Sequence, residues 1–226
     1  MIAPERVRYA AAGLLFAGAC FVVYPAIRPF SDEVTMQGAA TFASTEWLIA
    51  HVLAMLGFVL TALGTSGLRL ALTATPAERV AFRAAILTAI GVGLTLPFYG
   101  AEAFGLHAIG QAALRENSTT ILAISTEVRG GIGLALFLSG LAVLGLGAVL
   151  AAIAVRRSGV MFGWSGVPFA IGFALYIPQF FGTQPIRVAH GVLVAVGCLW
   201  IAYGMWRQST GGFLSSVVEI PLTRAV

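Results

Sequence analysis

The feature that most constrains the fold of this chain is a succession of apolar runs, each about as long as a bilayer is thick. A helix needs about 20 mainly apolar residues to cross the hydrocarbon core, and the 226 residues contain six such runs separated by short polar segments. Only 10% of the residues are charged, against about 25% in soluble domains. The chain is therefore expected to be all-α, a polytopic integral membrane helical bundle.

The predicted organisation is a single transmembrane domain over residues 1–206, followed by a short cytoplasmic tail over residues 207–226. The spans are expected at about residues 7–27, 47–72, 79–99, 130–155, 164–181 and 188–206. The longest connection, residues 100–127, begins with a stretch of helical composition and is broken at Asn117.

The fifth span is the least regular, because Pro168 and Pro178 lie within it. It still counts as a span, since proline is tolerated in a membrane helix where neighbouring groups satisfy the freed carbonyls. Gln179 and Gln184 lie beside prolines, and we expect them either to donate to such carbonyls or to line a small outer cavity.

The distribution of charge predicts the orientation of the bundle. All 13 basic residues are arginine. With an inner N-terminus, the inner side holds nine of them, Arg6, Arg8, Arg69, Arg79, Arg83, Arg156, Arg157, Arg207 and Arg224, and the outer side holds four, Arg28, Arg115, Arg129 and Arg187. Cytoplasmic loops carry the excess of basic residues. Both termini are therefore expected in the cytoplasm, and the alanine- and glycine-rich composition indicates a bacterial cytoplasmic (inner) membrane.

Several classes of function are disfavoured by the composition. Without lysine, the chain cannot form a retinal-type Schiff base. The arginines occur singly or in pairs beside apolar spans, which is unlike a nucleic-acid interface, and nucleotide-binding motifs are absent. Cys20 and Cys198 lie in apolar runs and are interpreted as small buried hydrophobic residues. The 27 glycines predict close helix packing, within the chain or in a homo-oligomer.

The residues that suggest chemistry gather on the predicted outer side. All three histidines, His51, His107 and His190, fall there. Glu102 follows an uncharged run, and a carboxylate in such surroundings needs a partner, for which Arg129 or Arg187 is suitable. Together with Glu46 and Glu127, these residues form what we term the outer polar cluster.

One hypothesis for this cluster is a single b-type haem between the second and sixth spans. At about 1.5 Å rise per residue, His51 lies about 6 Å below Trp47 and His190 about 4.5 Å below Arg187, so the two rings are at similar depth. Two neutral imidazoles from facing helices suit axial haem ligation. Each of these spans has one histidine, so at most one haem fits.

A second hypothesis is a metal-dependent lipid hydrolase at the outer interface. His51, His107 and His190 would bind zinc, and Glu102 or Glu127 would serve as the catalytic general base. Three nitrogen ligands with an open position for water form a catalytic zinc site. The sequence has no HExxH motif, so this hypothesis requires the three rings to meet in space.

The third hypothesis is a non-catalytic role in lipid or quinone binding, in transport, or as a structural subunit. Trp47, Tyr99 and Phe104 offer apolar walls for a ligand, and the glutamates and arginines offer polar contacts. Histidine, tryptophan, tyrosine and arginine are also common at membrane interfaces for purely structural reasons. The outer polar cluster is therefore compatible with a ligand site and with a simple membrane boundary.

Overall fold

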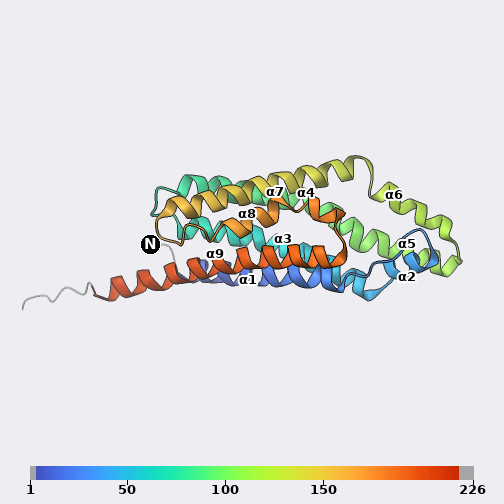
Figure 1. Ribbon diagram of the computed structural model, residues 1–226, viewed down its shortest axis with the longest axis horizontal. Helices are drawn as coiled ribbons and strands as arrows, with labels where there is room; N and C mark the ends of the chain where they lie inside the picture. Colours follow the sequence, from blue (N-terminus) through green and yellow to red (C-terminus); the bar gives the residue numbers. More distant parts are fainter. Residues whose placement is uncertain (1–3, 219–226) are drawn as a thin grey trace, which may run out of the picture.

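The computed structural model describes residues 4–218, with side chains described through residue 210, and each regular element in that range is helical (Figure 1). Five helices are long and apolar enough to cross a membrane: α1 (Pro4–Ile27), α3 (Thr45–Ala71), α4 (Glu78–Gly100) with its extension, α7 (Gly131–Ser158) and α9 (Gln184–Val218). The length and apolar composition of these helices thus support the prediction of a multi-pass helical membrane protein.

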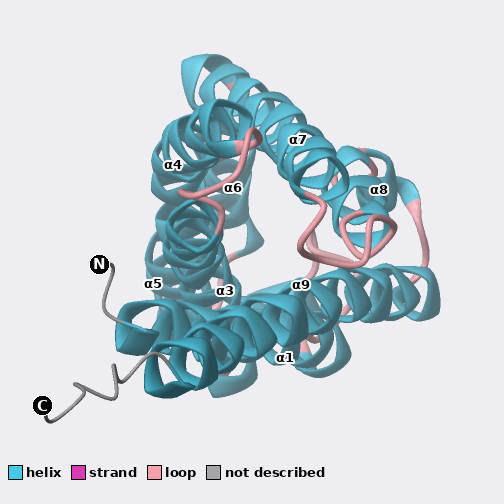
Figure 2. Cartoon of the chain, turned by 90° about the vertical axis from the view of Figure 1, so that its left-hand side faces the viewer, coloured by secondary structure: helices cyan, strands magenta, loops and turns pink. Residues whose placement is uncertain are grey.

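The helices form a ring in which each element packs on the next (Figure 2). The order around the ring is α1, α3, α4, α7, the short helix α8 (Val167–Ala174) and α9, which returns to α1. The core between them is formed by apolar side chains such as Phe21, Phe58 and Leu144. Ring closure depends on α8, the shortest member.

The predicted span boundaries agree closely with four of the helices. α1, α3, α4 and α7 begin and end within three residues of the expected limits. α9 begins four residues before residue 188 and continues to Val218, so residues 207–218 of the predicted tail are helical. Residues 219–226 of that tail lie outside the described part of the chain.

The third predicted span matches the regular α-helix α4, but the helical segment does not end there. α4 continues through a π-helical turn, η1 (Ala101–Gly105), into α5 (Leu106–Glu116). The whole apolar helix has 39 residues, or about 58 Å at 1.5 Å per residue, so its far part must extend beyond a hydrocarbon core of about 30 Å. Asn117 then adopts a left-handed conformation with φ 48° and ends the helix, as its sequence context predicts.

The far end of α5 carries a small second core, which we call the cap subdomain. Its helices are α2 (Met36–Phe42), α5, η2 (Thr119–Ala123) and α6 (Ile124–Val128), and they lie at the end of the molecule opposite the N-terminus (Figure 1). Their buried apolar residues include Phe42, Leu106 and Leu122, and Trp47 at the start of α3 joins this cluster. The cap subdomain thus rests on the end of the bundle.

The fifth predicted span is interrupted. It consists of α8, a turn, and the 3₁₀ helix η3 (Pro178–Phe181). The segment runs antiparallel to α9, since Gln208 donates to the carbonyl of Val160 at one end and Arg187 donates to the carbonyl of Phe180 at the other. Pro178 cannot donate a backbone hydrogen bond, which favours the break. This segment has no helix of spanning length.

Glycines bring helices of the same chain into close contact. A Cβ added to Gly91 on α4 would lie 2.6 Å from the backbone nitrogen of Leu144 on α7. A Cβ at Gly191 on α9 would lie 2.1 Å from the carbonyl oxygen of Phe21 on α1. These glycines therefore serve packing within the chain, and self-association through glycine-rich faces stays a prediction.

We predict that Gly91→Ala lowers the free energy of unfolding by about 1–3 kcal/mol, because the added methyl group forces α4 and α7 apart. Gly93→Ala is the matched control, since a Cβ there meets nothing within 4 Å. Thermal unfolding of the purified protein in detergent measures both. Equal stability of the two variants would contradict the proposed α4–α7 contact.

Candidate functional site

The three histidines have separate partners. Nδ1 of His51 donates to the carbonyl of Trp47 at 2.7 Å, and its Nε2 lies 3.6 Å from Oε2 of Glu102. Nδ1 of His107 donates to the carbonyl of Phe42 at 3.0 Å, and Nε2 of His190 donates to the carbonyl of Gly172 at 2.7 Å. Within the described residues, no group of three or more His, Cys, Asp or Glu side chains is placed to hold a metal ion.

These contacts bear on both cofactor hypotheses. A carbonyl only accepts, so Nδ1 of His51 carries a proton, and Nε2 is directed toward the carboxylate of Glu102 and not toward a cofactor. The zinc hypothesis requires three rings to converge, and the structure does not bring His51, His107 and His190 together as a metal-binding group. The haem between His51 and His190 stays a prediction, without a supporting contact.

Glu102 is the centre of the site. Nε of Arg129 donates to Oε1 at 2.5 Å and Nη2 donates to Oε2 at 3.0 Å, a bidentate pairing. Arg129 is one of the two partners that the sequence suggests for this carboxylate. Because Glu102 is buried, the ion pair compensates a charge that would otherwise be expensive to remove from water.

The local backbone explains how Glu102 reaches its partners. It lies in the π-helical turn η1, a type of turn that is frequent at functional sites. Pro97, about one turn earlier, cannot donate a backbone hydrogen bond. The α-helix widens into the π-helical turn just after this proline. Nε1 of Trp47 donates to the carbonyl of Glu102 at 2.7 Å, which ties the turn to α3.

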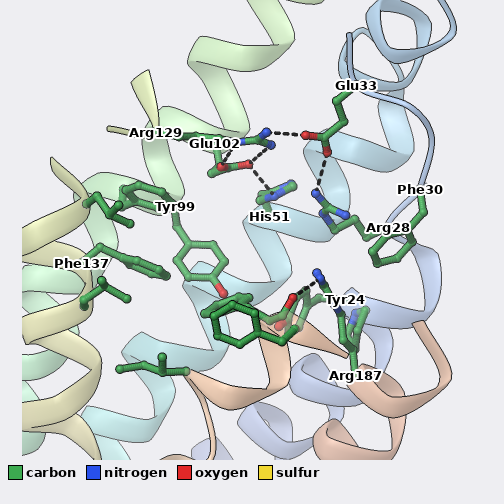
Figure 3. Close-up of a pocket in the computed structure, with 17 residues that line it drawn as sticks. Tyr24, Arg28, Phe30, Glu33, His51, Tyr99, Glu102, Arg129, Phe137 and Arg187 are labelled. Carbon is green, nitrogen blue, oxygen red and sulfur yellow. Dashed lines mark hydrogen bonds and ion pairs between the residues drawn. The ribbon is translucent and has the colours of Figure 1, made fainter. Parts of the chain in front are cut away.

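Two further residues extend the pair into a network. Nη1 of Arg129 donates to Oε2 of Glu33, and Nη2 of Arg28 donates to Oε1 of Glu33 at 3.3 Å (Figure 3). The resulting arginine–carboxylate network, Arg28–Glu33–Arg129–Glu102, connects the end of α1, the loop before α2, the α6–α7 turn and η1. Ion pairs, as well as the packing of Trp47, thereby attach the cap subdomain to the bundle.

The electrostatic balance of the two network arginines differs. Burial lowers the pKa of Arg28, and Arg129 and Arg187 add to this effect while Glu33 and Glu102 oppose it. Burial, the largest single effect, works against the charged form of Arg129, but the hydrogen bonds and charge interactions with Glu102 and Glu33 together outweigh it and raise the pKa of Arg129. Arginine stays protonated in both positions. Arg28 therefore has the less fully compensated charge.

A pocket of about 530 Å³ opens beside this network (Figure 3). Its polar side is formed by Arg28, Glu33, His51, Glu102, Arg129 and Arg187. Its other walls are aromatic and aliphatic: Tyr24, Pro25, Phe30, Phe98, Tyr99, Leu134, Phe137, Leu138, Ile177, Phe180 and Phe181. We call it the cap-end pocket. Its size and its combination of apolar walls with a few polar groups are typical of small-molecule sites.

Arg187 is the one pocket arginine without a carboxylate partner among the described residues. Its Nε donates to the carbonyl of Gly182 at 3.0 Å and its Nη2 to the carbonyl of Phe180 at 2.6 Å. Within residues 4–210, no carboxylate oxygen lies within 4 Å of it, and Phe30 packs against its guanidinium group. Backbone oxygens therefore hold this cation in place, and three of its five N–H groups are available to a ligand.

Three tyrosines meet beside the pocket. The hydroxyl of Tyr176 donates to the hydroxyl of Tyr24 at 3.3 Å and lies 3.5 Å from that of Tyr99. All three side chains are buried. They join α1, α4 and the turn after α8, three elements distant in sequence.

Other residues of the outer polar cluster lie elsewhere. Glu46, in the first turn of α3, and Glu127, in α6, are exposed and do not line the pocket. His107 belongs to the cap subdomain, where Gln111 also contacts it. The cysteines are both buried, as predicted.

Sequence reasoning missed the roles of Arg28 and Glu33. Arg28 was recognised only as a topological charge, and Glu33 lies in a polar loop whose conformation sequence periodicity does not predict. The adjacent pattern Arg28-Pro29-Phe30 at the end of an apolar run was the available signal. Comparison with protein-family models, curated proteins and solved structures finds no match to this chain, so its own residues carry the functional argument.

We predict that Glu102→Gln lowers the free energy of unfolding by about 2 kcal/mol, since it leaves Arg129 with only Glu33 as a charged partner. Glu46→Gln, at an exposed site, is the control and should have no effect. Adding Arg129→Gln to Glu102→Gln should cost less than the sum of the single changes. Additive effects in chemical denaturation would contradict the pairing.

Proposed function

We propose that this multi-pass membrane protein binds an anionic, partly apolar ligand in the cap-end pocket. The observation that carries the proposal is the position of Arg187, a half-buried cation without a carboxylate partner in the described chain, beside aromatic and aliphatic walls. A cation in such a low-polarity setting attracts an anion more strongly than one in water.

The charges that line the pocket agree with an anionic ligand. Arg28, Arg129 and Arg187 contribute three positive charges, while Glu33 and Glu102 contribute two negative ones. These five side chains leave one positive charge, which a monoanion would neutralise. Burial and the nearby charges of Arg129 and Arg187 disfavour the charged form of Arg28. A ligand anion nearby would stabilise that charged form.

A binding role fits the site better than hydrolysis does. A general base needs a carboxylate oxygen that is free to take a proton, but both oxygens of Glu102 accept hydrogen bonds from Arg129. The described residues include no candidate metal group to activate water. This supports the third hypothesis from the sequence, a non-catalytic or transport role.

We further propose that the segment 160–183 completes a sixth crossing, so that both termini are cytoplasmic and the pocket faces the outside of a bacterial inner membrane. The contacts at Gln208 and Arg187 are 21 residues apart on α9, about 32 Å at 1.5 Å per residue. That length matches a hydrocarbon core of about 30 Å. The nine-to-four arginine bias gives the orientation.

Cysteine labelling tests this topology. In intact cells, a membrane-impermeant maleimide should label Thr119→Cys in η2 but should label Thr73→Cys, in the turn after α3, only after permeabilisation. Both positions are exposed, and the native cysteines are buried. The reverse pattern would invert the orientation.

The binding proposal predicts that Arg187→Gln weakens octanoate binding about tenfold, the effect of losing a charged hydrogen bond of about 1.4 kcal/mol. Arg187→Lys keeps the charge and should retain most of the affinity. Arg207→Gln, which removes an exposed cation lining a separate pocket beside α8, is the control and should bind like the wild type. Equilibrium binding of radiolabelled octanoate to purified protein measures all three. Unchanged affinity in Arg187→Gln would exclude the proposed site.

A further inference from the structure

The cap-end pocket reaches the side of the bundle as well as its polar end. Leu134 and Leu138 on α7 line the pocket and are 37% and 36% exposed, and Phe181 at the end of η3 lines it and is 90% exposed. The same residues thus form both the pocket wall and the molecular surface. We call this boundary between α7 and η3 the side opening.

The broken segment accounts for the side opening. α8 packs on both α7 and α9, but it ends at Ala174 and is replaced by a turn and the four-residue η3. A continuous helix would cover the first turns of α7. Instead, Leu134 and Leu138, one turn apart on the face of α7 that lines the pocket, are exposed.

The side opening lies at a depth where lipid chains are found. Leu134 and Leu138 are three and seven residues from the start of α7 at Gly131, about 4.5 and 10.5 Å along the helix axis. α7 is one of the helices of spanning length, and its exposed side chains here are apolar. Hydrocarbon is therefore the medium expected outside the opening.

We infer that the ligand is a long-chain amphiphile with a single negative charge, whose head group binds Arg187 and Arg28 while its chain leaves through the side opening into the bilayer. The inference rests on the proposed function and adds the class of ligand and its path. A fatty carboxylate and the phosphodiester of an anionic phospholipid share this chemistry: one negative charge joined to a long apolar chain.

Two observations and one energetic argument favour a long chain over a small water-soluble anion. The cationic groups and the exposed leucines line one continuous pocket of about 530 Å³. That volume accommodates a head group and part of a chain, and the remainder has an apolar exit between α7 and η3. Each methylene group that stays in an apolar environment contributes about 0.8 kcal/mol.

The experiment blocks the side opening without touching the cationic end. Leu138→Trp places a large ring at an exposed position that lines the pocket, and Leu136→Trp places the same ring at an exposed position on α7 outside it. Full-length protein in nanodiscs of phosphatidylcholine is titrated with oleate and with octanoate. Addition of phosphatidylglycerol to the nanodiscs, or of inorganic phosphate to the buffer, tests for competition with oleate.

The inference predicts that Leu138→Trp weakens oleate binding at least about tenfold more than it weakens octanoate binding, the loss of about two methylene contacts. Leu136→Trp should bind both as the wild type does. Competition by phosphatidylglycerol identifies a phospholipid head group, and its absence identifies a free fatty carboxylate; both support the inference.

Other results would overturn it. If Leu138→Trp leaves oleate binding intact or weakens both ligands equally, or if inorganic phosphate displaces oleate, the site takes a small anion, and the proposed function survives without the side opening. If the wild-type protein binds neither octanoate nor oleate, the proposed function fails and this inference fails with it.

Discussion

The bidentate ion pair between Arg129 and Glu102 is the interaction on which the cap end of this protein depends. It joins the α6–α7 turn to the π-helical turn after α4, and Glu33 and Arg28 extend it to the end of α1. A buried carboxylate that loses such a partner leaves an uncompensated charge. The ion pairs among Arg28, Glu33, Arg129 and Glu102 therefore determine where the polar side chains of the cap-end pocket lie.

The interrupted segment between α7 and α9 shows how the chain satisfies its backbone where helical hydrogen bonds are lost. Arg187 donates to the carbonyls of Phe180 and Gly182, and Gln184 donates to the carbonyls of Pro25 and Ala26 at the end of α1. Irregular backbone at membrane depth is tolerated where protein groups supply such partners. The same bonds hold Arg187 at the pocket, so the interruption positions the cation that we propose binds the ligand.

Sequence reasoning predicted the helices far better than the site. Hydropathy located α1, α3, α4 and α7 within three residues, and the burial cost of a charge identified Glu102 as a residue that needs a partner. The constant rise per residue of an α-helix placed His51 and His190 at similar depth. Their side-chain directions were beyond such reasoning, since each ring has a partner from another element: Glu102 for His51 and Gly172 for His190. Gln184 donates to carbonyls at the end of α1 and not to carbonyls freed by a proline, and the buried amide of Gln179 has no hydrogen-bond partner among the described residues.

The amino-acid sequence alone determined that this chain folds as helices in a membrane, because a chain so apolar must satisfy its backbone internally in lipid. It also determined which charges lie near which ends of those helices. Only the tertiary structure decided that Arg28, Glu33, Glu102 and Arg129 form one network, and that Arg187 faces an apolar pocket. The reason is physical: hydropathy and helical rise fix position along an axis, whereas contact between distant segments depends on the rotation and packing of every helix in the ring.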